Sequence, residues 1–199
     1  MTTFTKFLRH AQPAIRSRSP TIRSFSYVSK HQAFPASLYR FQLYRTSRLY
    51  DQNTPEEDRE YNDVVEVSAD GLIHPKVDIG RSNGASFMPN THFMQEVTRG
   101  QFDTYLDDVD DGKPALDPHY LCIPKGTTIP ESLILYRDVQ AFFSLQPMQP
   151  MSLDGMLVLN ETLSQFYLDH GRFLDAEEWL GGHHYHEAFF DDKEDWMDH

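Results

Sequence analysis

The sequence predicts an α+β fold for a single domain, and three observations support this. Short apolar segments with strand character come first along the chain and amphipathic helical segments follow them, an order typical of α+β domains. The chain has 199 residues, a length that suggests one domain with appendages, and its 39% hydrophobic content is enough to form a core. No apolar run reaches the roughly 18 residues needed to cross a bilayer, so we expect no transmembrane helix.

Five segments have the composition of strands. The pattern that predicts them is an enrichment in aromatic and β-branched residues, in places alternating with polar ones. They span residues 37–44, 64–67, 119–123, 133–136 and 141–145. The third is followed by Pro124-Lys125-Gly126-Thr127, a turn in which Gly126 is expected to adopt a positive φ.

Three segments between these strands predict irregular structure. Residues 51–63 are acidic and predict a solvated loop or a short helix. Residues 74–84 contain one proline and two glycines and predict a loop. Residues 103–118 are acidic, contain one glycine and two prolines, and predict a surface loop.

Two helices are expected towards the C-terminus. Ser152 is a candidate N-cap for a helix through about Leu168, and His170-Gly171 is its stop signal. The apolar side of this helix comprises Met156, Leu159, Leu163, Phe166 and Tyr167. The second helix is expected to carry Phe173, Leu174 and Trp179 and to end at Gly181-Gly182, before a polar and mobile tail that begins at His183.

The net charge of −12 conceals a division of the chain into a basic and an acidic part. Residues 1–48 contain nine of the 18 Lys and Arg residues and no Asp or Glu, whereas residues 49–199 contain the other nine and all 30 acidic residues. The two parts therefore carry +9 and −21. The acidic body argues against nonspecific nucleic-acid binding, which needs a basic surface.

Residues 1–30 have the composition of a mitochondrial transit peptide. They are rich in Arg, Ser and Thr and lack acidic residues, and one helical face carries Phe4, Leu8, Ala11 and Ile15. We therefore expect a targeting segment at 1–33, a domain at 34–182 and a tail at 183–199. The alternative is a cytoplasmic protein with a disordered basic N-terminus.

The sequence offers little for a metal centre. The single cysteine, Cys122, lies in an apolar run and is expected to behave as a small buried hydrophobe, because one cysteine allows neither an internal disulfide nor a cysteine-based zinc site. The run His183-His184-Tyr185-His186-Glu187 could bind a metal adventitiously, but no second cluster of ligands is visible. We therefore predict no metal site.

Three segments, taken together, resemble one family of toxins. They are Asp70-Gly71-Leu72-Ile73-His74-Pro75, then Asn83-Gly84-Ala85-Ser86-Phe87, then residues 123–130 followed later by residues 146–151. In this order and spacing they resemble the bacterial type VI secretion toxin Tse-two and its eukaryotic, notably fungal, relatives. The resemblance extends over roughly residues 35–180. It implies an ADP-ribosyltransferase-like mixed sheet around an NAD cleft, with C-terminal helices.

The resemblance also implies a chemistry. ADP-ribosyltransferases break the bond between nicotinamide and ribose through an oxocarbenium-like transition state, as in glycoside cleavage. An Arg on the first strand holds an anionic part of NAD, because guanidinium pairs with phosphate through two hydrogen bonds. A Ser or Thr on a second strand braces the nicotinamide end of the cleft. An acid, usually Glu, stands before a Pro-x-Gly-Thr turn and stabilises the developing positive charge.

Carried onto this chain, the resemblance assigns the catalytic roles to Arg40, Ser86 and Tyr120. Arg45 is a competing register for the first element. The implied NAD-binding set comprises Arg40, Arg45, Ala85, Ser86, His119 and Tyr120.

The third element departs from the family pattern. Four residues before Pro124, where the acid should stand, the chain has Tyr120. Tyrosine can hydrogen-bond a ribose hydroxyl or stack on nicotinamide, but it cannot act as a carboxylate. The adjacent His119 is expected to face the opposite side of the strand. NAD binding is therefore better supported by the sequence than turnover.

Three functions remain open on this basis. The leading one is a toxin-like enzyme that uses NAD, either a mono-ADP-ribosyltransferase that modifies a macromolecular acceptor or an NAD glycohydrolase that hydrolyses NAD. An immunity-type protein is a candidate partner. The second is a module that binds NAD or another nucleotide without turnover. The third is an organelle interaction protein that keeps the fold but not the chemistry.

Overall fold

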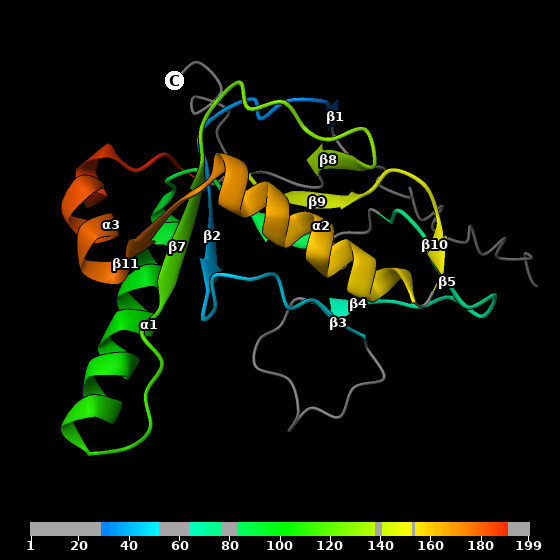
Figure 1. The fold of residues 1–199 in the computed structure, drawn as a ribbon. Helices are drawn as coiled ribbons and strands as arrows, with labels where there is room; N and C mark the ends of the chain where they lie inside the picture. The colour runs from blue at the N-terminus through cyan, green and yellow to red at the C-terminus, as the bar shows by residue number, and fades with distance from the viewer. Residues whose placement is uncertain (1–28, 52–63, 77–82, 138–140, 153, 191–199) are drawn as a thin grey trace, which may run out of the picture.

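The computed structural model describes residues 29–51, 64–76, 83–137, 141–152 and 154–190 (Figure 1). Two larger antiparallel sheets organise this part of the chain. The four-stranded sheet has the order β1 (Ser29–His31), β8 (Leu133–Arg137), β9 (Phe143–Pro147) and β6 (Ala85–Phe87). The three-stranded sheet has the order β11 (Arg172–Asp175), β7 (His119–Ile123) and β2 (Leu38–Gln42).

Two short strand pairs extend this framework. β10 (Met151–Ser152) pairs with β5 (Leu72–Ile73) in antiparallel fashion, and β3 (Tyr50–Asp51) pairs with β4 (Val64–Val65) in parallel. The mixture of sheets with three helices is an α+β arrangement, which confirms the fold class predicted from the sequence.

The two larger sheets meet where β2 passes the end of β6. The backbone N–H of Tyr39 donates to the carbonyl of Met88 at 2.7 Å, and the N–H of Met88 donates to the carbonyl of Tyr39 at 2.9 Å. Met88 directly follows β6 in the chain. This bridge places β2 of the three-stranded sheet beside β6 of the four-stranded sheet, and the candidate site is built on these two strands.

Helix α2 (Gly155–His170) closes the larger core (Figure 1). Its predicted apolar side is confirmed, since Leu159, Leu163, Phe166 and Tyr167 are buried and Met156 is partly buried against the same core. The helix also ends at His170-Gly171 as predicted. It begins later than predicted, because Ser152 belongs to β10 and the N-cap residue is Asp154.

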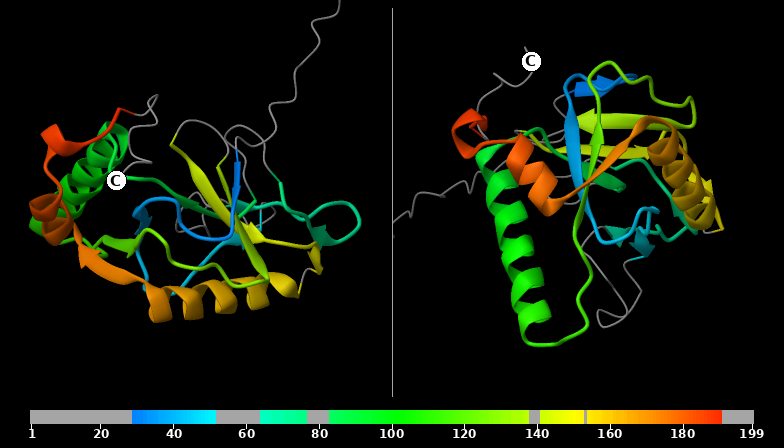
Figure 2. Two further views of the ribbon diagram at one scale, coloured as in Figure 1. Left: turned by 90° about the horizontal axis from the view of Figure 1, so that it is seen from above. Right: turned by 60° about the vertical axis from the view of Figure 1, so that its left-hand side comes forward.

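The other face of the three-stranded sheet carries a second core. Helix α1 (His92–Asp110) and helix α3 (Ala176–Gly182) pack against this face (Figure 2). The buried members of this core are Tyr39, Met88, Met94, Tyr120, Leu174, Ala176 and Trp179. The three-stranded sheet therefore has an apolar layer on each side, and the buried polar residues Arg40 and Gln42 lie on the side of the larger core.

The prediction of a surface loop at 103–118 is wrong, because α1 continues to Asp110. The helix is started by Thr91, whose hydroxyl accepts a hydrogen bond from the N–H of Met94 at 3.2 Å. The aspartates of residues 103–110 are compatible with a helix because this half of α1 buries none of its side chains. The helix ends where the N–H of Gly112 donates to the carbonyl of Val109 at 3.0 Å, two residues before Pro114.

The first part of the second predicted helix is a strand in the structure. Phe173 and Leu174 lie in β11, and only the residues from Ala176 onward form α3. Asp175 separates them, because its carboxylate accepts from the N–H of Glu178 at 2.7 Å while the Glu178 side chain accepts from the N–H of Asp175. This capping box starts a new helix directly after the strand.

The segment after α3 packs against the body instead of forming the predicted mobile tail. Tyr185–Glu187 forms a 3₁₀ turn, and Phe189 exchanges backbone hydrogen bonds with the start of α1: its carbonyl accepts from His92 and its N–H donates to Asn90. The described chain is anchored in this way up to Phe190.

Several local predictions are confirmed. The strands at 119–123 and 133–136 are β7 and β8, and β2 lies within the predicted 37–44. Gly126 adopts a φ of 83°, as its turn requires. The strand predicted at 141–145 occurs two residues later, as β9. The prediction of a buried Cys122 is wrong, because this residue is only partly buried against the second core. The predictions for residues 1–28 and 52–63 lie outside the described residues.

Candidate functional site

The strand register decides which predicted site residues share a face of the three-stranded sheet. Residues directly opposite each other on paired strands point to the same face. One row across the sheet is Arg40, Leu121 and Phe173, and the next is Gln42, His119 and Asp175. The intervening row is Phe41, Tyr120 and Leu174, which points the other way. The structure therefore brings Arg40 and His119 to one face and places Tyr120 on the opposite one.

Arg40 lies at the junction between the two larger sheets. Its Nη1 donates to the backbone carbonyl of Ser86 on β6 at 3.2 Å, and its Nε donates to Oε1 of Gln42 at 2.9 Å. The residue is only 2% exposed. Burial of a guanidinium is costly unless its donors are satisfied, so these contacts hold the group in a fixed place between β2 and β6.

Ser86 is brought close to Arg40, but through its backbone. On β6 its neighbours Ala85 and Phe87 point into the larger core, and the Ser86 side chain is exposed on the alternate face. Arg40 therefore contacts the Ser86 carbonyl, while the Ser86 hydroxyl points away from that core. Ala85, a predicted NAD-binding residue, is fully buried, so its side chain is inaccessible to a ligand.

Gly84 and Asn83 set the position of β6. A side chain at Gly84 would place its Cβ 2.3 Å from the Leu145 carbonyl oxygen, so only glycine permits this approach of β6 to β9. The Asn83 side chain accepts from the N–H of Glu66 at 2.6 Å and donates to the carbonyls of Glu66 and His74 at 3.1 and 2.9 Å. The Asn83-Gly84 pair of the family-like motif therefore has a structural role.

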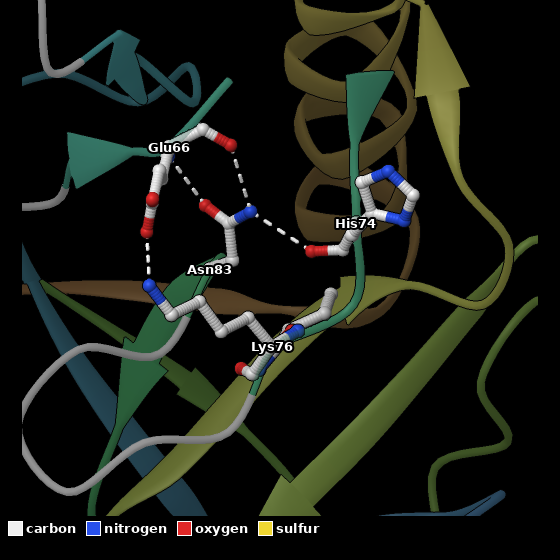
Figure 3. Close-up of polar contacts among 5 residues, drawn as sticks. Glu66, His74, Lys76 and Asn83 are labelled. Atoms are coloured by element: carbon white, nitrogen blue, oxygen red, sulfur yellow. Dashed lines mark hydrogen bonds and ion pairs between the residues drawn. The ribbon is translucent and has the colours of Figure 1, made fainter. Parts of the chain in front are cut away.

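Figure 3 shows how this network extends from Asn83. The ammonium of Lys76 forms an ion pair with the carboxylate of Glu66. The Gln146 side chain accepts from the N–H of Lys76 at 2.8 Å and donates to its carbonyl at 2.7 Å. The first, second and last family-like segments, which are distant in sequence, are thus connected by hydrogen bonds in one place.

Arg45 and His119 occupy the same side of the sheet as Arg40. The Arg45 guanidinium carbon lies 5.7 Å from the ring centroid of Phe173, which is in the Arg40 row. Arg45 is exposed, so it is the more accessible of the two arginines. His119 is half-buried and stands directly opposite Gln42. Two guanidinium groups and one imidazole therefore lie on this face.

Tyr120 belongs to an aromatic core instead. It is fully buried, and its ring centroid lies 5.5 Å from that of Trp179 and 5.8 Å from that of Phe41. Burial raises the pKa of Tyr120 to about 12, and the nearby Thr98 side chain acts weakly in the opposite direction. The hydroxyl is buried without a well-formed hydrogen bond. This placement keeps the phenol away from a ligand that contacts Arg40.

The Arg40 face carries side chains of a kind that can pair with an anion. Two guanidinium groups match the charge and geometry of a pyrophosphate, and His119 adds a further donor or acceptor. Among the described residues, the carboxylate in the same cross-strand row as His119 is Asp175, and one of its oxygens caps α3. This side of the sheet therefore carries two guanidinium groups, while one oxygen of the carboxylate in its rows is already engaged by α3.

Gln42 is a buried partner of Arg40 that was not among the residues predicted from the sequence. A residue two positions after Arg40 on a strand must lie on the same face, so the signal was the period of two combined with a polar residue at a buried position. The prediction for Tyr120 followed the linear motif, which does not contain the strand register.

No group of three or more His, Cys, Asp or Glu side chains in the described parts of the chain is arranged to hold a metal ion. Within the same residues, every helix is too short or too polar to cross a bilayer.

Comparison with known proteins identifies one family. No curated protein matches the chain. The family described as Tse2 ADP-ribosyltransferase toxin matches residues 36–179, which include both strands that carry Arg40 and Ser86 and all the family-like segments. Because the match covers more than half of the chain, the protein belongs to the Tse2 ADP-ribosyltransferase toxin family.

Proposed function

We propose that this protein is a mono-ADP-ribosyltransferase toxin that uses NAD and binds the dinucleotide on the Arg40 face. Membership of the family supports the reaction class. The observation that carries the proposal is the contact between the Arg40 guanidinium of β2 and the Ser86 carbonyl of β6, because it joins two of the family's expected site elements at the junction of the sheets.

In this proposal Arg40 and Arg45 hold the pyrophosphate of NAD. Guanidinium groups bind phosphate oxygens through paired hydrogen bonds, and both arginines lie on one side of the three-stranded sheet. Because Arg40 is only 2% exposed, a phosphate can reach it only if the groups that cover it move. Arg45 is exposed and would make the first contact. Binding of NAD therefore includes a local rearrangement.

The reaction itself transfers ADP-ribose. The bond between nicotinamide nitrogen and C1′ of the ribose breaks, and nicotinamide leaves with the bonding electrons as a neutral molecule. A nucleophile of the acceptor, or water, forms a new bond to C1′ and loses a proton. The transition state carries positive charge on the ribose, so a nearby anion or carbonyl dipole accelerates the step. The Ser86 hydroxyl keeps its expected role at the nicotinamide end in this proposal.

A second candidate is a protein that binds NAD without turnover. The observation that favours it is the third family element: Tyr120 stands in the position of the acid, and its side chain points away from Arg40. The Asp175 carboxylate is in the His119 row, but it already accepts the N-cap hydrogen bond of α3. Turnover therefore requires another carboxylate, from Asp175 or from the acceptor, to stabilise the positive charge on the ribose.

Release of nicotinamide from NAD separates the two candidates. The purified protein is incubated with NAD, alone and with a cell extract as the source of acceptors, and nicotinamide is quantified by chromatography. The transferase proposal predicts release by the wild-type protein and loss in Arg40→Lys, which keeps the charge but not the fork of donors. NAD binding in calorimetry without any release would establish the binding module instead. Neither binding nor release would refute both.

Import into mitochondria is a separate proposal that rests on the composition of residues 1–30. Fusing residues 1–35 to a fluorescent reporter tests it in cells. A mitochondrial signal is expected, and a diffuse cytosolic signal would refute it.

A further inference from the structure

Gln42 is the buried amide beside Arg40. It is 2% exposed, and both ends of its side chain are hydrogen-bonded. Its Oε1 accepts from Nε of Arg40 at 2.9 Å, and its Nε2 donates to the backbone carbonyl of Tyr44 at 3.0 Å. The amide therefore connects the guanidinium to the backbone just beyond the end of β2.

The two partners admit a single orientation of this amide. The Nε of Arg40 can only donate, so it requires the amide oxygen, whereas the carbonyl of Tyr44 can only accept, so it requires the amide nitrogen. A flipped amide would oppose donor to donor and acceptor to acceptor. Neither an apolar side chain nor a carboxylate can make both contacts.

The result is a guanidinium held at two of its nitrogens. Gln42 holds Nε from the same strand, and the Ser86 carbonyl holds Nη1 from β6 at 3.2 Å. Two such contacts, to different nitrogens of the group, define its plane. Recognition of a phosphate through paired hydrogen bonds depends on that plane.

We propose that Gln42 is a positioning residue that fixes the plane of the Arg40 guanidinium for the pyrophosphate of NAD. This inference rests on the proposed use of NAD. Gln42 acts through Arg40 and takes no part in breaking the bond to nicotinamide. Its loss should therefore weaken NAD binding and leave the chemical step nearly unchanged.

The experiment compares Gln42→Met with Gln146→Met, measuring KM and kcat for nicotinamide release together with the melting temperature. Gln146 is a matched control: it is also fully buried, and its amide likewise accepts one hydrogen bond and donates another, in this case both with backbone groups of Lys76. Both variants should lose comparable stability. Only Gln42→Met should raise KM, by about tenfold or more, with kcat within about threefold of the wild type.

A second variant, Gln42→Glu, keeps an acceptor for Arg40 but cannot donate to the carbonyl of Tyr44. Its negative charge also offsets the positive charge of the guanidinium. It should also raise KM by about tenfold or more, and it serves if Gln42→Met fails to fold. An unchanged KM in a folded Gln42 variant would overturn the inference while leaving the proposed function intact. An equal rise of KM in Gln146→Met would also overturn it, because the effect would then be general. An inactive wild-type protein that binds no NAD would refute the proposed function itself.

Discussion

Replacing Asn83 by alanine should destabilise the protein strongly, because its side chain makes three hydrogen bonds to backbone groups. It accepts from the N–H of Glu66 and donates to the carbonyls of Glu66 and His74, and it is 2% exposed. Each net hydrogen bond contributes about 1 kcal/mol, and more when its partner is left buried and unsatisfied. The expected loss is about 3 kcal/mol, a large part of a typical stability of roughly 5–15 kcal/mol.

Urea unfolding followed by circular dichroism measures the loss in free energy of unfolding. In thermal unfolding, a domain of this size should show a fall in melting temperature of about 6–12 °C for the same change. Asn160→Ala is the matched control for stability, since the Asn160 amide also makes three bonds, to the Ser47 hydroxyl and to both backbone groups of Leu49. A loss below about 1 kcal/mol in Asn83→Ala would refute the structural role given to the Asn83-Gly84 pair.

Three further predictions concern Gly84 and Tyr120. Gly84→Ala should lower the free energy of unfolding by about 2 kcal/mol or more, measured with denaturant, because its Cβ would overlap the Leu145 carbonyl. The control Gly100→Ala has open space around its Cβ on α1 and should be neutral or stabilising. Equal effects of the two changes would contradict the close packing at Gly84. Tyr120→Phe should keep both stability and nicotinamide release. It removes a buried hydroxyl that has no well-formed hydrogen bond and that lies on the face away from Arg40. Loss of release in a folded variant would show that Tyr120 takes part in the reaction. Burial raises the pKa of Tyr120 to about 12 from an unfolded value of 10.0. The stabilisation that depends on the protonated phenol should therefore be complete below pH 10, and the free energy of unfolding should fall by about 3 kcal/mol as the pH rises to 12. An alkaline unfolding profile that is the same in Tyr120→Phe would contradict this.

The parts of the fold that the sequence predicted correctly are those governed by local periodicity. β7, its glycine turn and the apolar side of α2 follow from alternation, positive φ and the 3.6-residue repeat. The prediction failed at α1 because an acidic run was taken as a loop. Its signals were present: Thr91 at the start and Gly112 with Pro114 at the end are the ordinary boundaries of a helix.

The candidate site was only partly predictable, because its geometry depends on strand register. Arg40, Arg45 and His119 were predicted from the sequence and lie on one side of the sheet, but the sequence alone could not show that Tyr120 faces the second core. A linear motif gives the order of residues, and a shift of one residue along a strand reverses the face. Gln42 was missed because the period of two places it on the face of Arg40, but its burial and its hydrogen-bond partners are visible only in the folded chain.

Calorimetric titration of NAD into the wild-type protein and into Arg40→Lys and Tyr120→Phe tests whether the dinucleotide binds at Arg40. The wild-type protein and Tyr120→Phe should bind NAD with the same affinity, and Arg40→Lys, folded by circular dichroism, should bind at least about tenfold more weakly. Wild-type affinity in Arg40→Lys would place the dinucleotide elsewhere on the protein and refute binding at Arg40.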